Sequence, residues 1–196
     1  MGGIGSRTLD VGDKRELLLD AAERTFCRLG YARTTIGELA ADAGVTRPTI
    51  YAYFQSKDAV FAALADRIRQ EFLTLQEEAD TSSPAGIARS TLTAFLDTHV
   101  RHFGMLTILA HQAIVDPAMR ELRAEIHGRA TRRHTRFIER LVAQGHANPA
   151  IQPALVSEVV TGVVARFAEQ AADDPRKQPA LAEALVTLYI RLVGLT

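Results

Sequence analysis

The sequence predicts an all-α protein with a small N-terminal unit of three helices and a larger helical region after it. Apolar residues recur at three- and four-residue spacing, proline and glycine interrupt that pattern, and no stretch alternates as a strand would. The chain has 196 residues, of which 47% are hydrophobic, enough for a small domain plus a larger one.

The first helix is expected to begin near Asp13, with Glu16 in its first turn, and to end at Gly30. Its apolar stripe consists of Leu18, Ala21, Ala22, Phe26 and Leu29. Cys27, the only cysteine, falls inside this helix and is predicted to be a small core residue. A single cysteine excludes an internal disulfide and fits a reducing cytosol.

The stretch from Thr34 to Lys57 predicts two short helices joined by a tight turn, followed by the start of a third. Thr35 and Glu38 fit a capping box at the first of these helices. Gly44 can adopt the left-handed conformation that ends it sharply. Helix, glycine turn and helix in this order are typical of a helix-turn-helix DNA reader.

The second of these helices is predicted to start after a Thr46 N-cap, with Ile50 and Phe54 facing the first. Its other side carries side chains suited to DNA. An arginine can read guanine and a threonine can meet a base edge, whereas tyrosine hydroxyls and a lysine at a helix N-terminus suit phosphate. The residues of this helix are Arg47, Pro48, Thr49, Tyr51, Ala52 and Tyr53, and Lys57 follows at the N-terminus of the next helix, after its predicted cap Ser56. The alternative is a plain hydrophobic subdomain with both tyrosines half-buried.

This segment resembles the DNA-binding domain of the TetR family of bacterial regulators over roughly residues 13 to 70. The matching pieces are Gly30-Tyr31-x-x-Thr34-Thr35, Ile36-x-x-Leu39-Ala40, Ala43-Gly44-Val45, Thr49-Ile50-Tyr51-x-Tyr53-Phe54 and Ser56-Lys57. The resemblance implies a homodimer that binds double-stranded DNA at a palindromic operator and leaves it when a small molecule enters the C-terminal domain. It also implies DNA contacts at Thr35, Arg47, Pro48, Thr49, Tyr51, Tyr53 and Lys57.

The charge and hydropathy of the chain limit which other classes of protein it can belong to. The formal net charge is zero, and up to Asp80 ten basic side chains face thirteen acidic ones. Nonspecific DNA affinity should therefore be weak, and a dimer would offset that weakness by doubling the footprint. No apolar run approaches a membrane span and no signal-peptide core precedes the first helix, so we expect a cytoplasmic protein without membrane contact. Residues 1–12 are expected to form a flexible arm, although Met-Gly-x-x-x-Ser also matches a permissive myristoylation pattern.

The helix beginning at Ser56 is predicted to continue through Ile68 and Phe72 to Leu75, linking the DNA-binding domain at 13–57 to the remainder at 58–196. Thr81-Ser82-Ser83-Pro84 breaks the pattern. Further helices are predicted near 84–103, 104–115, 117–145, 153–172 and 179–194.

The last two predicted helices are the most apolar, with stripes wide enough for the core and a partner. The stripes are Val156, Val159, Val160, Val163, Val164 and Phe167 on one, and Leu181, Leu185, Leu188 and Leu192 on the other. Two such helices from each subunit would form the homodimer interface. The alternative is burial within a monomer.

The middle helices combine apolar bulk with scattered polar groups, which a ligand pocket requires. The candidate ligand-binding region comprises Phe95, His99, Phe103, Leu106, Leu109, His111, Gln112, Met119, Ile126, His134, Phe137 and Ile138. Its composition predicts a hydrophobic or amphipathic small-molecule effector. For each apolar member, simple core packing is the alternative.

Two further patterns leave alternatives open. His99 and His102 share a helix face and, with His111, resemble metal ligands, but hydrogen-bonding or solvated histidines are the preferred interpretation. The basic run containing Arg132, Arg133 and Arg136 is a solvated face or a site for an anionic ligand.

The sequence as a whole predicts a three-helix DNA-binding domain with a helix-turn-helix and a helical C-terminal domain for ligand binding and dimerisation. The expected function is a ligand-responsive repressor with no catalytic residues, cofactor or metal. The rivals are a histidine-dependent helical enzyme and a helical small-molecule-binding protein without DNA function. No nucleophile–base pair or phosphate-binding loop supports the enzyme.

Overall fold

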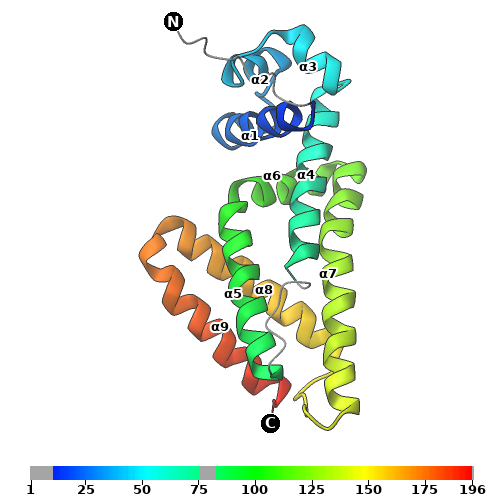
Figure 1. Cartoon of the computed structure of the whole chain (residues 1–196), viewed down its shortest axis with the longest axis vertical. Helices are drawn as coiled ribbons and strands as arrows, with labels where there is room; N and C mark the ends of the chain where they lie inside the picture. Colours follow the sequence, from blue (N-terminus) through cyan, green and yellow to red (C-terminus); the bar gives the residue numbers. More distant parts are fainter. Residues whose placement is uncertain (1–10, 76–82, 196) are drawn as a thin grey trace, which may run out of the picture. The chain divides into compact units, whose positions relative to one another are not determined.

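The computed structural model describes residues 11–75 and 83–195, and helices account for all the longer elements there. The predicted all-α fold is therefore confirmed. The elements are α1 (Val11–Leu29), α2 (Ile36–Asp42), α3 (Arg47–Tyr53), α4 (Lys57–Thr74), α5 (Pro84–Arg101), α6 (Phe103–Val115), α7 (Pro117–Ala143), α8 (Pro153–Asp173), the short 3-10 helix η1 (Pro175–Lys177) and α9 (Gln178–Val193) (Figure 1). In the described part of the chain, none of these helices is long and apolar enough to cross a membrane.

The chain divides into two compact units, Met1–Asp66 and Arg67–Thr196. The division falls inside α4, so this helix contributes residues to both units. Residues 11 and 12 of the expected N-terminal arm belong to α1, and the remainder of that arm lies outside the described residues. Thr81 and Ser82 of the expected break also lie outside them. Ser83 caps α5, because its Oγ accepts a hydrogen bond from the Gly86 N–H at 3.0 Å.

The first unit is organised around aromatic and aliphatic side chains from α1 and α4. The ring of Phe26 meets Phe61 edge-on at 5.1 Å and stacks on Tyr31 at 5.9 Å, measured between ring centroids. Leu18, Ala21, Ala22 and Phe26 of the predicted stripe are buried. Cys27 is exposed, so its prediction as a core residue was wrong. One position beyond Phe26 on a helix turns by about 100°, which takes the cysteine off the buried stripe.

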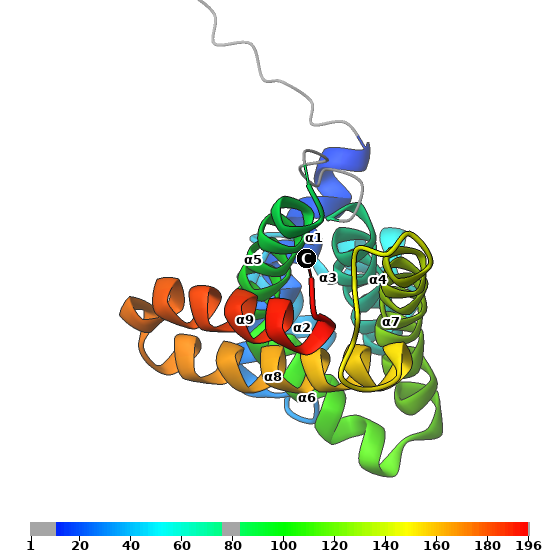
Figure 2. The same ribbon diagram turned by 90° about the horizontal axis from the view of Figure 1, so that it is seen from below.

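In the second unit, α8 packs against α5, α7 and α9, and α5 also packs against α9. Figure 2 shows α8 and α9 lying side by side. The core cluster includes Leu96 of α5, Ile138 of α7, Val160 of α8 and Leu185 of α9, all at most 3% exposed. These four helices therefore share one core, and α6 packs mainly against α7.

Gly194 closes the second unit at the end of α9. Its φ is +62°, and a Cβ there would lie 2.4 Å from the carbonyl oxygen of Asn148. The same segment pairs with the chain end through the Asn148 N–H, which donates to the Gly194 carbonyl at 3.1 Å. A side chain would thus meet both backbone strain and a backbone atom that cannot move without breaking this pairing.

Gly194→Ala should lower the free energy of unfolding by about 2 kcal/mol or more, since the left-handed conformation alone costs ~1–2 kcal/mol. Gly145→Ala is the matched control in the same unit, because its φ is +75° but nothing lies within 4 Å of the added Cβ. Urea denaturation of both variants measures the difference. Equal destabilisation would show that the Asn148 contact contributes nothing.

Candidate DNA-binding surface and ligand cavity

Residues of α2 and the turn after it set the geometry of the first candidate surface. The Glu38 N–H donates to Thr35 Oγ1 at 3.2 Å, which is one half of the predicted capping box. The reciprocal bond from the Glu38 carboxylate is not among the hydrogen bonds of the described residues. Gly44 has φ +65°, and the Val45 N–H donates to the Ala40 carbonyl at 2.9 Å. The turn therefore forms as the sequence predicts.

Helix α3 presents one face to the core and the other to solvent. Ile50 and Phe54 are buried at 2% and 4% exposure, which anchors the helix within the unit. Tyr51 is 56% exposed, so the alternative that it belongs to a hydrophobic core does not describe it. On the same exposed side lie Arg47, Pro48 and Ala52, while Thr49 and Tyr53 are half-buried. Thr35, which caps α2, is exposed as well.

Two contacts orient the N-terminal end of α3. The Arg47 guanidinium lies over Gly37 of α2, where a Cβ would come within 2.7 Å of its nearer Nη atom. The hydroxyls of Thr46 and Thr49 are hydrogen-bonded to each other at 3.0 Å. Thr46 occupies the predicted N-cap position, but its hydroxyl accepts no backbone N–H of α3. Gly37 thus leaves space for Arg47 to lie flat across α2.

Lys57 is held within the first unit. Its Nζ donates to the carbonyl oxygen of Tyr31 at 3.0 Å and lies 4.4 Å from the centroid of the Tyr31 ring. The Tyr31 hydroxyl in turn donates to Asp58 Oδ1. The side chain therefore joins the start of α4 to the turn that follows α1. A phosphate contact by Lys57 would have to share or replace this bond.

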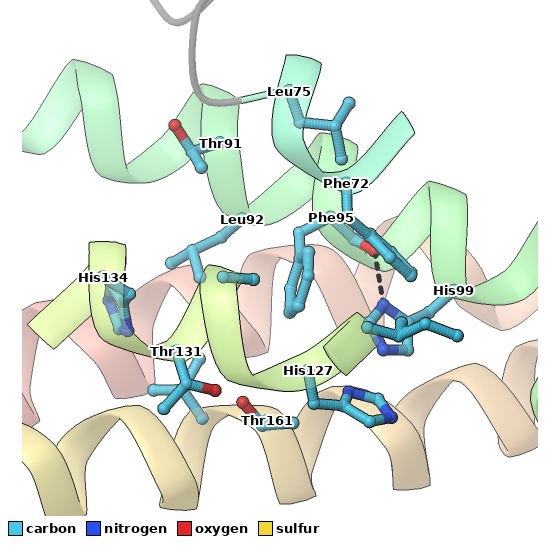
Figure 3. A pocket seen from close by; sticks show the side chains of 13 residues that line it. Phe72, Leu75, Thr91, Leu92, Phe95, His99, His127, Thr131, His134 and Thr161 are labelled. Atoms are coloured by element: carbon cyan, nitrogen blue, oxygen red, sulfur yellow. Dashed lines mark hydrogen bonds between the residues drawn. The ribbon is translucent and has the colours of Figure 1, made fainter. Parts of the chain in front are cut away.

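A second candidate site lies in the second unit. It includes a small cavity with a volume of about 40 Å³, which we call the inner cavity. It is lined by Phe72, Leu75, Thr91, Leu92, Phe95, His99, Ile126, His127, Ala130, Thr131, His134, Val160 and Thr161. Figure 3 shows these side chains converging from α4, α5, α7 and α8. Apart from the histidines, the described residues of its lining have no ionisable side chain.

An outer groove of about 750 Å³ adjoins the inner cavity. It is lined by His99, Phe103, Leu106, Thr107, Ala110, Arg120, Arg123, Ala124, His127, Gly128, Thr131, Arg132, Glu158, Thr161, Gly162, Ala165 and Ala168. Four of these residues, His99, His127, Thr131 and Thr161, also line the inner cavity. Drug-sized ligands occupy roughly 300–1,000 Å³, so the groove has the required size and the inner cavity alone does not.

The predicted ligand region divides between these cavities and the surrounding structure. Phe95, Ile126 and His134 line the inner cavity, Phe103 and Leu106 line the groove, and His99 lines both. The remaining candidates line neither. Leu109, Met119 and Ile138 are buried, Phe137 packs on the core cluster, Gln112 is half-buried and His111 is exposed.

Sequence reasoning missed Phe72, Leu75, Thr91, Leu92, His127, Ala130, Thr131, Val160 and Thr161. A signal existed for some of them, because Thr91 and Phe95 share the face of His99 at four-residue spacing. His127 and Thr131 likewise share a face of α7. The three threonines give a weaker signal, because a hydroxyl on a helix usually bonds its own backbone, as the Thr161 hydroxyl does to the Ser157 carbonyl at 2.9 Å.

Burial keeps the cavity histidines uncharged near neutral pH. Desolvation lowers the pKa of His99 to about 4, opposed by its hydrogen bond to the Phe95 carbonyl and assisted by His127 and His102. Desolvation also lowers the pKa of His134 to about 4, and its Nε2 is hydrogen-bonded to the Tyr189 hydroxyl at 3.0 Å. The pKa of His127 is lowered by burial and by Arg123.

The histidines predicted as an alternative metal site have separate partners. His102 Nε2 lies 3.1 Å from Glu71 Oε2, whereas the Nδ1 of His99 bonds the Phe95 carbonyl. The two aspartates that could assist such a metal site also have other partners. Asp116 caps α7 by accepting the Ala118 N–H at 2.8 Å, and Asp97 accepts from Gln178 Nε2 at 2.7 Å. Within the described ranges, no group of three or more His, Cys, Asp or Glu side chains is arranged to hold a metal ion.

Comparison with known proteins relates the first unit to a large group of regulators. Residues 18–64 match the profile of the family described as "Bacterial regulatory proteins, tetR family". The chain is 32% identical over 124 residues to the HTH-type transcriptional regulator TtgR of Pseudomonas putida, covering 59% of this chain and 58% of that regulator. It is 31% identical over 130 residues to the HTH-type transcriptional repressor BepR of Brucella suis, covering 60% and 62%. These matches span less than two thirds of each relative.

Solved structures extend the similarity of fold to nearly the whole chain. GusR of Salmonella enterica superposes with a TM-score of 0.79 at 14% identity, covering 96% of this chain and all of that one. A TetR-like transcriptional regulator from a Rhodococcus species superposes with a TM-score of 0.73 at 24% identity, covering 93% and 97%. At these identities the superpositions establish the fold alone. TtgR, BepR and the Rhodococcus protein are named as transcriptional regulators or repressors, and none of them supports the rival interpretation as an enzyme.

Proposed function

The chain belongs to the TetR family of bacterial regulatory proteins, and from this we propose that it is a ligand-responsive transcriptional repressor that binds a palindromic DNA operator. The observation that carries the proposal is the exposed face of α3. Arg47, Pro48, Tyr51 and Ala52 face solvent from a helix whose opposite side is anchored by buried Ile50 and Phe54. A short anchored helix with an exposed arginine and tyrosine has the side chains that major-groove reading requires.

The proposed DNA contacts are Thr35, Arg47, Pro48, Thr49, Tyr51, Tyr53 and Lys57. Arg47 would read guanine, while the hydroxyls of Tyr51 and Tyr53 would bond phosphate oxygens. Lys57 would act partly through the Tyr31 carbonyl that it bonds, by fixing the start of α4 against the turn that follows α1.

A homodimer would present two such helices to a palindrome. We propose that it forms through the outward sides of α8 and α9. Val156, Val160, Val164 and Leu185 of the predicted stripes are buried inside the protomer, so they cannot also meet a partner. The side of α8 left to a partner carries Leu155 and Val159, at 53% and 42% exposure. On α9 a surface hollow is lined by Ala150, Glu183, Ala184, Thr187, Leu188, Arg191 and Leu192.

The effector is proposed to be a hydrophobic or amphipathic small molecule that binds in the outer groove and inner cavity. Phe72 lines the inner cavity and Lys57 begins the same helix, α4. A ligand that displaces Phe72 would shift α4 and change the spacing of the two α3 helices. Effector and operator would then weaken each other's binding by the same coupling free energy.

Selection of bound duplexes from a random DNA pool, at stated salt concentration, tests the proposal. The wild-type protein should enrich a palindrome, and the variant Arg47→Ala/Tyr51→Ala should not. Lys57 is left intact because its removal would also break the bond to Tyr31. A folded dimer that enriches no sequence at low salt would contradict the proposed function.

A further inference from the structure

His99 carries a hydrogen-bonding atom that has no partner among the described residues. The residue is 3% exposed, and its Nδ1 lies 3.0 Å from the carbonyl oxygen of Phe95 (Figure 3). Because a carbonyl only accepts, Nδ1 carries the proton of the neutral ring. The Nε2 atom is then a lone-pair acceptor, and it is buried with no hydrogen-bond partner among the described residues. A buried acceptor left unpaired is costly, so this atom favours a donor.

Aromatic rings surround that acceptor. The His99 ring lies 4.5 Å from the ring of Phe95 and 4.6 Å from the ring of Phe72, between centroids. Leu92 and Ile126 complete the apolar walls nearby. Rings at these separations, some tilted and some edge-on, form a site that accepts an aromatic or other apolar body.

The described residues bring no charge into the same enclosure. Among them, no carboxylate, lysine or arginine lines the inner cavity, and burial keeps its histidines neutral. A carboxylate or an ammonium group placed there would lose its hydration without gaining an opposite charge. The inner end of a ligand must therefore be uncharged.

Size determines how such a ligand lies. The inner cavity holds about 40 Å³, but His99, His127, Thr131 and Thr161 belong equally to the outer groove of about 750 Å³. A ligand in the groove can thus place one end beside His99 without first passing through the core. The remainder of the molecule would lie along α6, α7 and α8.

We propose that the inner end of the effector is uncharged and apolar and carries an O–H or N–H donor, and that this donor binds Nε2 of His99. The inference rests on the proposed function, because it specifies the ligand of the same cavity. His99 is then the residue that selects donors over otherwise identical molecules that lack one. Its Nδ1 bond to Phe95 holds the ring in the tautomer that accepts.

The test compares 4-butylphenol with 4-butylanisole, two probes that differ by a methyl group on the oxygen. Calorimetric titration of the DNA-free protein should give an affinity about tenfold higher for the phenol, the usual size of one well-formed buried hydrogen bond. In His99→Phe, which keeps an aromatic ring but removes the acceptor, the two affinities should agree within about twofold. His111→Phe is the matched control, because His111 is exposed and lines neither cavity, and it should keep the tenfold preference.

Equal affinity of the wild-type protein for the two probes would overturn the inference, as would a preference that survives in His99→Phe. Binding of neither probe would overturn it too. The wild-type comparison decides the matter if His99→Phe fails to fold. Because these titrations contain no DNA, their outcome is independent of operator selection. A recovered operator with no phenol preference removes only this inference, whereas a phenol preference without any operator removes the proposed repressor function.

Discussion

The double substitution Arg47→Ala/Tyr51→Ala is expected to weaken binding to the selected operator by about a thousandfold. A base contact by arginine contributes ~1–3 kcal/mol, and a homodimer loses it twice, with the tyrosine phosphate contacts in addition. Neither side chain is part of the core, since Arg47 is exposed and Tyr51 is 56% exposed. The free energy of unfolding should therefore change by no more than about 0.5 kcal/mol.

Fluorescence anisotropy with labelled operator, at fixed salt concentration, measures the loss. Arg176→Ala is the matched control for charge, because Arg176 is an exposed arginine in the second unit that pairs with Asp174. The control should bind as the wild-type protein does. If the double variant retained operator affinity within tenfold, the exposed face of α3 would not be the DNA-reading surface.

Acidification from pH 7 to pH 5 is expected to lower the free energy of unfolding by roughly 4 kcal/mol through two histidines. Burial lowers the pKa of His99 and of His134 to about 4, against an ordinary value of 6.5 that applies in the unfolded chain. At pH values between these two pKa values, the histidines bind protons in the unfolded state but stay unprotonated in the native state. Stability is therefore full above pH 6.5 and falls as the pH drops towards 4, by about 2 kcal/mol per imidazole at pH 5. His127, whose pKa is also lowered, adds to the fall with the same sign.

Urea denaturation at pH 7 and pH 5 measures this dependence, in a window above the range where most carboxylates titrate. His99→Phe should reduce the fall by about 2 kcal/mol, because one of the two imidazoles whose pKa lies at about 4 is gone. An unaltered pH dependence in His99→Phe would show that the native state accommodates a protonated His99.

Most helix boundaries could be predicted from the sequence to within a few residues. Capping is local chemistry, and Thr35, Ser83 and Asp116 each accept a backbone N–H only two or three residues ahead. Pro153 and Gly44 act at their own positions in the same way. The exposed face of α3 followed from the same periodicity, because buried Ile50 and Phe54 leave Tyr51 on the other side.

The cavity could be predicted only in part. Phe95, His99 and His134 were named as candidates, and they do line it. Phe72 and Thr161 were not, because α4 and α8 approach α5 and α7 only after the chain has folded. Lys57 shows the same limit, since its bond to the Tyr31 carbonyl joins residues 26 positions apart.

The amino-acid sequence by itself determined the all-α class, the helix-turn-helix and the residues exposed on α3, because caps, glycine turns and apolar periodicity act over a few residues. The tertiary structure alone decided which side chains enclose the cavity, which face of α8 and α9 is exposed, and which nitrogen of His99 has no donor among the described residues. Those properties depend on how helices distant in sequence pack together, and the periodicity of a single helix carries no information about its neighbour.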